Sequence, residues 1–353
     1  MGWNCGLVGL PNAGKSTLFK ALTKQNVSID SYPFSTVDPN RARVPISDPR
    51  LDELATMCNS TKKTPATIEV IDVAGLVKGA SRGEGLGNQF LGHLRNVDLL
   101  IHVVSAFDVN PTDEWCKVEE RINTINIELC LADLETVLRR IEKNKVKGKS
   151  GDKATLQEMS ILEYTGNCLN QGCGIISCQI EPGDKKCLEP LNLLTAKKML
   201  FVLNTSEQLD AVHFGDGFSQ NSFVVPVCAK LEAELSDLGE DDLKEFLQEY
   251  GLNELQSKKL LTSCYQYLEL ISFYTVKGTE AKSWVVPCGT NALDASAKIH
   301  SDIKQGFINV EVVDSSVLVS AGSLSSVREK GMSRIEGKEY IVQDGDVLFF
   351  RFR

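Results

Sequence analysis

The fold of this chain is decided by the stretch Gly9-Leu10-Pro11-Asn12-Ala13-Gly14-Lys15-Ser16, which fits the pattern G-x-x-x-x-G-K-S without a mismatch. A short apolar run at Cys5–Gly9 predicts a strand before it, and Lys15–Leu22 predicts a helix after it. In such a loop the backbone N–H groups point inward, and the positive end of the helix adds to their effect on an anion. The segment therefore predicts a phosphate-binding loop in an α/β fold.

The residues around this loop predict a metal site and a catalytic centre. Lys15 is expected to reach the β- and γ-phosphates, and the Ser16 hydroxyl is expected to ligate Mg²⁺. The apolar run Ile68–Val73 contains Asp72, a second metal ligand, and the Gly75 N–H is expected to meet the γ-phosphate. Thr36 lies between the two motifs and is expected to complete the metal shell when a triphosphate is bound. The predicted catalytic residues are Lys15, Asn12 and Gly75, and the predicted phosphate-loop contacts are Asn12, Ala13, Gly14, Lys15, Ser16 and Thr17.

Further runs rich in Val, Ile and Leu predict a parallel sheet covered on both faces, and they lie at Leu99–Val104, Leu200–Leu203 and Phe223–Val227. Between Trp115 and Lys198 the apolar residues recur at three- and four-residue intervals. This spacing predicts a long helix followed by a second helix over Lys153–Asn170. Residues 139–153 hold seven basic and two acidic residues, a net charge of +5. Both a solvated helix tip and a nucleic-acid contact surface fit this charge.

After about residue 270 the sequence predicts a small α+β module. Its expected elements are strands at Ser283–Pro287, Phe307–Val313, Glu339–Gln343 and Val347–Phe352, a helix at Leu293–His300, and a tight turn at Gly345 between the last two strands. The predicted domains are residues 1–114 with 199–270 for nucleotide binding, 115–198 for an inserted helical hairpin, and 271–353 for the C-terminal module.

Composition excludes several classes of protein. The 353 residues are 42% hydrophobic and 24% charged, with no apolar stretch long enough for a membrane helix and no secretory signal. The 38 basic and 47 acidic residues give a net charge of −9, which argues against a surface that coats nucleic acid as a whole. The 11 cysteines are interpreted as reduced thiols. The cluster Cys168, Cys173, Cys178 and Cys187 lacks the spacing of a zinc site and is interpreted as small apolar side chains.

The segment after Leu200–Leu203 bears on the identity of the base. Where GTP-binding proteins carry N-K-x-D, this chain has Asn204, Thr205 and then Glu207 at the fourth position. The Lys stem that packs over guanine is absent, and the longer Glu207 side chain moves the carboxylate that would accept from guanine. Adenine has no N1–H to donate and loses nothing. The segment predicts ATP in preference to GTP.

In these motifs taken together, the chain resembles the YchF / Obg-like ATPase family. The resemblance covers nearly the whole chain and is carried by Asp48-Pro49-Arg50-Leu51-Asp52, the run from Leu76 to Leu91, Cys228–Glu234 and Gly337–Val347. It implies a Ras-like P-loop domain with an inserted α-helical hairpin and a C-terminal β-grasp domain of the ubiquitin-like TGS type. It also implies ATP hydrolysis, a cytoplasmic location, association with ribosomes and a role in translation or stress. Cys228 and Ala229 are implied as further nucleotide contacts, and Asn204 as facing the base edge.

The hydrolytic step is less well defined by the sequence. Leu76 stands where Ras-like enzymes place a water-orienting Gln, and the resembling family shares this apolar residue. By analogy with related potassium-dependent GTPases, Asn12 is a candidate K⁺ ligand, and the bound K⁺ would neutralise transition-state charge. The family's loop with a catalytic His is replaced here by the short His-free segment Phe107–Asp113, and His102 is interpreted as a core residue. Slow intrinsic turnover is therefore expected.

Three functions stay open on these residues. The first is an ATPase that gates ribosome association, the second is an Obg-type GTPase, and the third is a non-hydrolysing ATP-gated protein that binds the ribosome or RNA. Neither a membrane nor sequence-specific DNA is expected as a partner.

Overall fold

The computed structural model describes residues 2–23, 40–73, 91–109, 115–147, 153–206, 223–249, 252 and 254–353. The chain forms two compact units. One unit consists of Trp3–Arg43 and Glu69–Leu260, and the other of Met1–Gly2, Val44–Ile68 and Leu261–Arg353. The predicted nucleotide-binding range 1–114 includes residues 44–68, which pack with the C-terminal residues.

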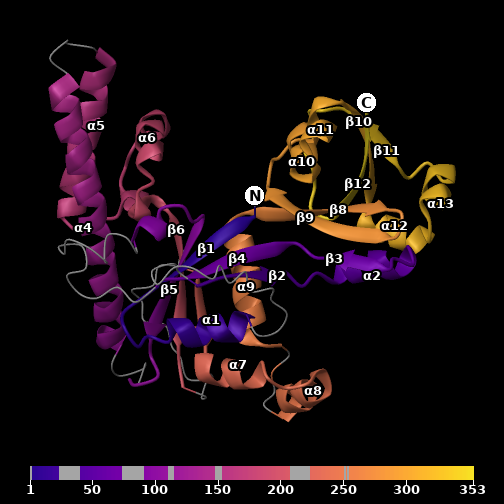
Figure 1. The fold of residues 1–353 in the computed structure, drawn as a ribbon, viewed down its shortest axis with the longest axis horizontal. Coiled ribbons are helices and arrows are strands. Elements are labelled where there is room, and N and C mark those ends of the chain that lie inside the picture. The colour runs from indigo at the N-terminus through magenta and orange to yellow at the C-terminus, as the bar shows by residue number, and fades with distance from the viewer. Residues whose placement is uncertain are drawn as a thin grey trace. The chain divides into compact units, whose positions relative to one another are not determined.

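The first unit is built on a six-stranded sheet with the order β2-β4-β1-β5-β6-β7 (Figure 1). The neighbouring pairs β1–β5, β5–β6 and β6–β7 are parallel, as the sequence predicted. All the residues of β5 except Ser105 are buried, so both faces of the sheet are covered at its centre. The strands are β1 (Trp3–Val8), β2 (Asn40–Pro45), β4 (Thr67–Asp72), β5 (Leu99–Ser105), β6 (Lys198–Asn204) and β7 (Val224–Val227).

Helices surround this sheet and place the phosphate loop at the ends of its strands. Helix α1 (Lys15–Thr23) follows β1 and packs beside α7 (Ala229–Leu235), which follows β7. Helix α4 (Trp115–Lys147) covers one face, where Ile125 and Leu129 share a core with Leu100 of β5. Helices α8 (Glu240–Glu249) and α9 (Gln256–Tyr267) come later in the chain. Because the central strands are parallel, the loops after β1, β5 and β6 meet at one edge.

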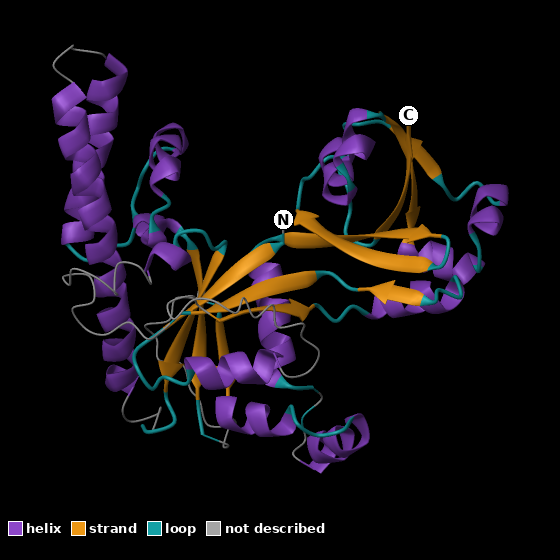
Figure 2. Cartoon of the chain, in the orientation of Figure 1, coloured by secondary structure: helices purple, strands orange, loops and turns teal. Residues whose placement is uncertain are grey.

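The inserted segment forms the predicted pair of helices, α4 and α5 (Lys153–Asn170), which pack against each other (Figure 2). The chain returns to β6 through α6 (Pro182–Leu188) and the 3₁₀ turns Ile175–Ser177, Glu189–Leu191 and Leu194–Ala196. A wholly buried carboxylate anchors this return. Asp133 accepts from the backbone N–H groups of Leu194 and Thr195 at 3.0 and 2.8 Å, and from Arg95 Nη1 at 3.2 Å.

The cysteine cluster lies inside the inserted segment. Cys178 is buried in its hydrophobic core, and Cys168, Cys173 and Cys187 pack against that core. These cysteines are free thiols, and the described residues contain no group of three or more side chains suited to hold a metal ion. The four side chains therefore contribute to apolar packing, which is the interpretation drawn from their spacing.

The C-terminal unit has its own six-stranded sheet, with the order β11-β10-β12-β8-β9-β3. Pairs β8–β9 and β10–β12 are antiparallel, and β12 is parallel to β8. This mixed sheet with a helix after its first hairpin agrees with the predicted β-grasp class. Its elements are β3 (Lys62–Thr64), β8 (Leu270–Lys277), β9 (Glu280–Pro287), α10 (Ala292–Ile299), α11 (Ser301–Gln305), β10 (Phe307–Asp314), α12 (Ser315–Ala321), α13 (Leu324–Glu329), β11 (Arg334–Glu336) and β12 (Asp346–Phe352).

One predicted strand of this unit is wrong. Glu339–Gln343 forms no strand, and its ladder contact is a single bridge between Ile341 and Asn291. Its backbone bonds instead to the start of α10, where Ala292 N donates to the Tyr340 carbonyl at 2.8 Å. Gly345 is in the left-handed region with φ 97°, but its turn leads into β12 alone. Strands β8 and β11 were not predicted.

The segment Asp48-Pro49-Arg50-Leu51-Asp52 begins helix α2 (Pro49–Met57), which belongs to the C-terminal unit. Arg50 Nη1 donates to Asp344 at 2.7 Å, and its Nε donates to Asp48 at 3.0 Å. Tyr274 donates its hydroxyl hydrogen to Asp48 as well. Leu51 and Leu54 are buried in the core of this unit. The segment between β2 and β4, which contains α2 and β3, thus completes the C-terminal sheet and its core.

No helix among the described residues is both long and apolar enough to span a membrane.

Candidate nucleotide-binding site

The loop between β1 and α1 has the curled backbone that a phosphate loop requires. Asn12 and Gly14 lie in the left-handed region, with φ 62° and 97°. A Cβ on Gly14 would lie 2.1 Å from Asn204 Nδ2, and one on Gly9 would lie 2.3 Å from the Val103 carbonyl oxygen. Neither position has room for a side chain. Both motif glycines are therefore explained by close contact with β5 and β6.

Lys15 folds back over the loop that precedes it. Its side chain is buried, and Nζ donates to the carbonyl oxygens of Gly9 at 3.1 Å and Leu10 at 2.8 Å. Burial lowers the pKa of Lys15, while the charge of Asp72 opposes that shift. A phosphate group in the loop would give this buried ammonium a full negative charge to pair with. The contact of Lys15 with the terminal phosphates stays a prediction.

Asp72 stands at the end of β4 with a buried carboxyl group, 6% exposed. Burial raises its pKa, and a hydrogen bond from Ser16 and the charge of Lys15 act in the opposite direction. Its Oδ1 atom is buried without a hydrogen-bond partner in the described part of the chain. An orphaned carboxylate oxygen beside a serine hydroxyl fits a hard divalent cation such as Mg²⁺. Thr36 and Gly75, also predicted here, lie outside the described residues.

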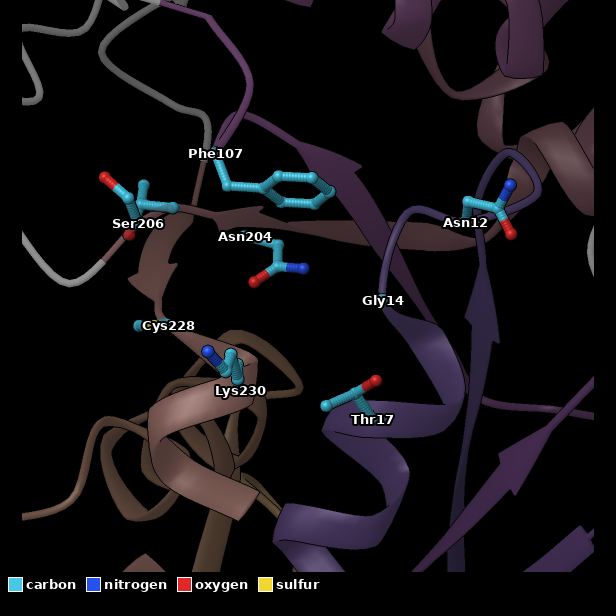
Figure 3. Close-up of a pocket in the computed structure, with 9 residues that line it drawn as sticks. Asn12, Gly14, Thr17, Phe107, Asn204, Ser206, Cys228 and Lys230 are labelled. Carbon is cyan, nitrogen blue, oxygen red and sulfur yellow. The ribbon is translucent and has the colours of Figure 1, made fainter. Parts of the chain in front are cut away.

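A cavity of about 780 Å³ opens beside the loop (Figure 3). The described residues that line it come from the phosphate loop, α1, the ends of β5 and β6, and the start of α7: Asn12, Gly14, Thr17, Phe107, Asn204, Thr205, Ser206, Cys228 and Lys230. A volume of this order suits a small organic ligand. The phosphate loop therefore forms one wall of a pocket that has room for a base and sugar.

Asn204 joins three parts of this pocket. Its Nδ2 donates to the Ala13 carbonyl at 2.9 Å, and its Oδ1 accepts from the Ala229 N–H at 3.1 Å. The N–H and the oxygen of this one amide thus hold the phosphate loop and α7 in place, a role beyond the predicted contact with the base edge. Thr205 follows; it is 4% exposed, and its hydroxyl has no hydrogen-bond partner among the described residues. Glu207 lies outside the described part of the chain.

The structure therefore brings most of the predicted site residues to one place. Asn12, Gly14, Thr17, Asn204, Thr205 and Cys228 line the pocket. Lys15 and Ser16 interact with Asp72, and Ala13 and Ala229 contribute the backbone groups bonded to Asn204.

Sequence reasoning missed three residues of the pocket, namely Phe107, Ser206 and Lys230. Phe107 follows the end of β5 and is 46% exposed. Figure 3 shows Phe107 and Lys230 on opposite sides of Asn204. The available signal was topological, because residues that follow buried parallel strands gather at the ligand-binding edge.

His102 lies inside β5 and is buried, with its ring centroid 5.4 Å from that of Phe201. Burial, together with the charge of Lys15, lowers its pKa to about 3. The imidazole is thus neutral at physiological pH and packs within the sheet, as interpreted from the sequence. It lies outside the residues that line the pocket.

The strand order, the curled loop after β1 and the Asp72 strand define a P-loop nucleotide-binding protein of the Ras-like class. Family models match the same regions. The C-terminal domain of YchF GTPases, described as a protein of unknown function, matches residues 270–353, and a family described as 50S ribosome-binding GTPase matches residues 4–140.

Known proteins resemble the whole chain. Two relatives named ribosome-binding ATPase YchF come from Pasteurella multocida, 39% identical, and Bacillus subtilis, 40% identical, each matched over 100% of this chain and 99% or 100% of its own length. The solved structure of the Schizosaccharomyces pombe YchF GTPase is 30% identical, with a TM-score of 0.84 over 99% of this chain and 97% of its own. The chain belongs to the YchF family.

Proposed function

We propose that this chain binds and hydrolyses ATP and that its nucleotide state gates association with ribosomes. The bacterial relatives are named ribosome-binding ATPases, whereas the fission yeast relative is described as a GTPase. The base pocket favours ATP. The observation that carries this choice is Thr205, which stands at the pocket wall where guanine-binding proteins place a lysine.

The described part of the pocket lacks the lysine stem that packs over guanine. Thr205 is too short to lay an aliphatic stem over the base. Its neighbour Asn204 bonds to the phosphate loop and to α7, which does not distinguish between purines. From the sequence, Glu207 is expected to hold its carboxylate away from the guanine donors, and each donor left unpaired would cost about 1–3 kcal/mol. Adenine places no N1–H there. Phe107 offers an aromatic face, which accepts either purine and so adds affinity without selectivity.

The phosphates are bound by groups already positioned for them. The N–H groups of the loop and the start of α1 would meet the anion, and the buried Lys15 would add a positive charge. Ser16 and Asp72 would hold Mg²⁺, which neutralises charge on the phosphate oxygens when bound. Asn12, exposed and held in a left-handed conformation, is proposed as a K⁺ ligand at the same anion.

The cellular side of the proposal rests on the relatives. We place the protein in the cytoplasm, where it would act on translation or a stress response through the ribosome. The C-terminal unit, proposed as a TGS domain, and the inserted hairpin contribute no described residue to the lining of the nucleotide pocket. They are therefore the candidate surfaces for ribosomal contact.

Two alternatives follow from particular observations. A GTPase is supported by the description of the fission yeast relative. A non-hydrolysing ATP-gated protein is supported by the short segment after β5, which contains no histidine.

Displacement of a fluorescent ATP analogue by ATP and by GTP, with Mg²⁺ present, tests the choice of base. We expect ATP to displace it at a far lower concentration. Equal displacement by the two nucleotides would remove the base-site argument and favour the GTPase. Single-turnover hydrolysis then separates the ATPase from the non-hydrolysing alternative, because only the ATPase converts bound ATP to ADP and phosphate.

A further inference from the structure

A single arginine ties the beginning of helix α4 to the segment that follows β5. Arg121 Nη1 and Nη2 donate to the two carboxylate oxygens of Asp108 at 2.7 and 2.8 Å. Nη1 also donates to the Ser105 carbonyl oxygen at 2.7 Å and to its hydroxyl oxygen at 3.0 Å. A planar guanidinium that meets a carboxylate with both nitrogens fixes orientation as well as distance. Arg121 thus holds the residues on either side of the segment 106–107.

Phe107 lies between these two tethered positions. The preceding residue is fixed on the other side as well, because Ala106 N donates to the Asn204 carbonyl at 2.8 Å. The Phe107 ring itself is 46% exposed and lines the pocket. Its position therefore depends on the backbone around it, and Arg121 and Asn204 supply the bonds that hold that backbone.

The ion pair is partly open to solvent, with the Arg121 and Asp108 side chains 23% and 48% exposed. Exposed ion pairs contribute little to the stability of a fold. The arginine nevertheless holds the pKa of the Asp108 carboxyl below its usual range, mainly through these hydrogen bonds. The contact is thus geometrically well defined while adding little to folding, which suits a positioning role.

We propose that Arg121 is a positioning residue for the nucleotide base. Through Ser105 and Asp108 it holds Phe107 against the purine, so that base affinity depends on how the start of α4 is attached. The inference rests on the proposed function of the same pocket. Without Arg121, residues 106–107 would become ordered only when the nucleotide binds. The conformational entropy lost in that ordering weakens nucleotide binding. The triphosphate, held by Lys15 and Ser16, does not depend on Arg121.

Two ligands separate the effect on the base from the effect on the phosphates. Dissociation constants are measured for ATP and for inorganic tripolyphosphate, both with Mg²⁺, on the full chain. Arg121→Met keeps the apolar stem and removes the hydrogen bonds. We expect it to weaken ATP binding about five- to tenfold and to leave tripolyphosphate within about twofold. The matched control is Arg139→Met on the same helix, whose partner Glu135 is on the surface, and it should change neither constant.

A double-mutant cycle with Phe107→Ala tests the route of the effect. Once the ring is absent, Arg121→Met should change the ATP constant by less than about twofold. Full additivity, equal weakening of ATP and tripolyphosphate, or wild-type affinity in Arg121→Met would each overturn the inference.

Two further observations keep the test interpretable. If Arg121→Met does not fold, Asp108→Asn leaves the bonds to Ser105 and should show a smaller loss with the same ATP-only pattern; no loss there would also overturn the inference. If wild-type protein binds tripolyphosphate but no ATP, the proposed function fails instead.

Discussion

The buried carboxylate of Asp133 gives the most direct test of how the inserted hairpin is held. Asp133 accepts four hydrogen bonds: two from the backbone N–H groups of Leu194 and Thr195, one from the Thr195 hydroxyl and one from Arg95. Its side chain has no exposed surface, and that of Arg95 is 22% exposed. Asp133→Ala removes every acceptor at once and leaves two buried N–H groups unpaired.

The expected loss can be worked from these groups. Each unpaired buried N–H costs about 1–3 kcal/mol, and the loss of the ionic partner of Arg95 adds to that sum. Partial relaxation and water entry lower it, so we expect Asp133→Ala to reduce the free energy of unfolding by about 3–5 kcal/mol. Asp133→Asn keeps one acceptor oxygen in nearly the same shape and should lose less than the alanine variant.

Urea unfolding followed by circular dichroism measures this loss, with Glu135→Gln on the same helix as the control. Glu135 pairs with Arg139 on the surface, so its replacement should cost less than about 1 kcal/mol. Equal unfolding midpoints for Asp133→Ala and Glu135→Gln, at equal slopes, would refute the reasoning.

Three further predictions concern pH, the base and the monovalent ion. Arg328 lowers the pKa of Glu311 below its ordinary value of 4.5. The ion pair therefore stabilises the folded state above pH 4.5, and this stabilisation is lost as the pH falls through the lowered pKa. The urea unfolding midpoint of the wild type should fall between about pH 6 and pH 3, and that of Glu311→Gln should fall less. Glu207→Asp alone should leave the preference for ATP unchanged, whereas Thr205→Lys with Glu207→Asp should bring the affinity for GTP closer to that for ATP. Both affinities are measured by displacement of the fluorescent ATP analogue. GTP binding restored by the single variant would contradict the base-site reasoning. Hydrolysis should be faster in KCl than in NaCl at equal ionic strength, and Asn12→Ala should remove the difference; identical wild-type rates in the two salts would exclude Asn12 as an ion ligand.

The nucleotide unit was largely predictable because its signals are local. The phosphate loop, Asp72 and the helices at Lys15 and Lys153 each follow from a short motif or from periodicity within one segment. Asn204 was predicted as a nucleotide contact, but its hydrogen bond to the Ala13 carbonyl was not predicted.

The features that were missed depend on contacts distant in sequence. Phe107 and Lys230 belong to the pocket only because β5 and β7 end beside the loop. Glu339–Gln343 has strand-like residues, but its backbone groups find partners at the start of α10. Strand β3 pairs with β9 across more than half of the chain, and nothing within Lys62–Thr64 indicates that partner.

The segment between β2 and β4 constrains the order in which the chain can fold during synthesis. Leu51 and Leu54 emerge early, yet the side chains that cover them, including Tyr274 and Val347, are made after the whole nucleotide unit. Until then these apolar residues have no permanent core. A fragment that starts at residue 261 would lack α2 and β3 and expose the complementary surface. The C-terminal unit therefore cannot be separated from the nucleotide unit by a single cut in the chain.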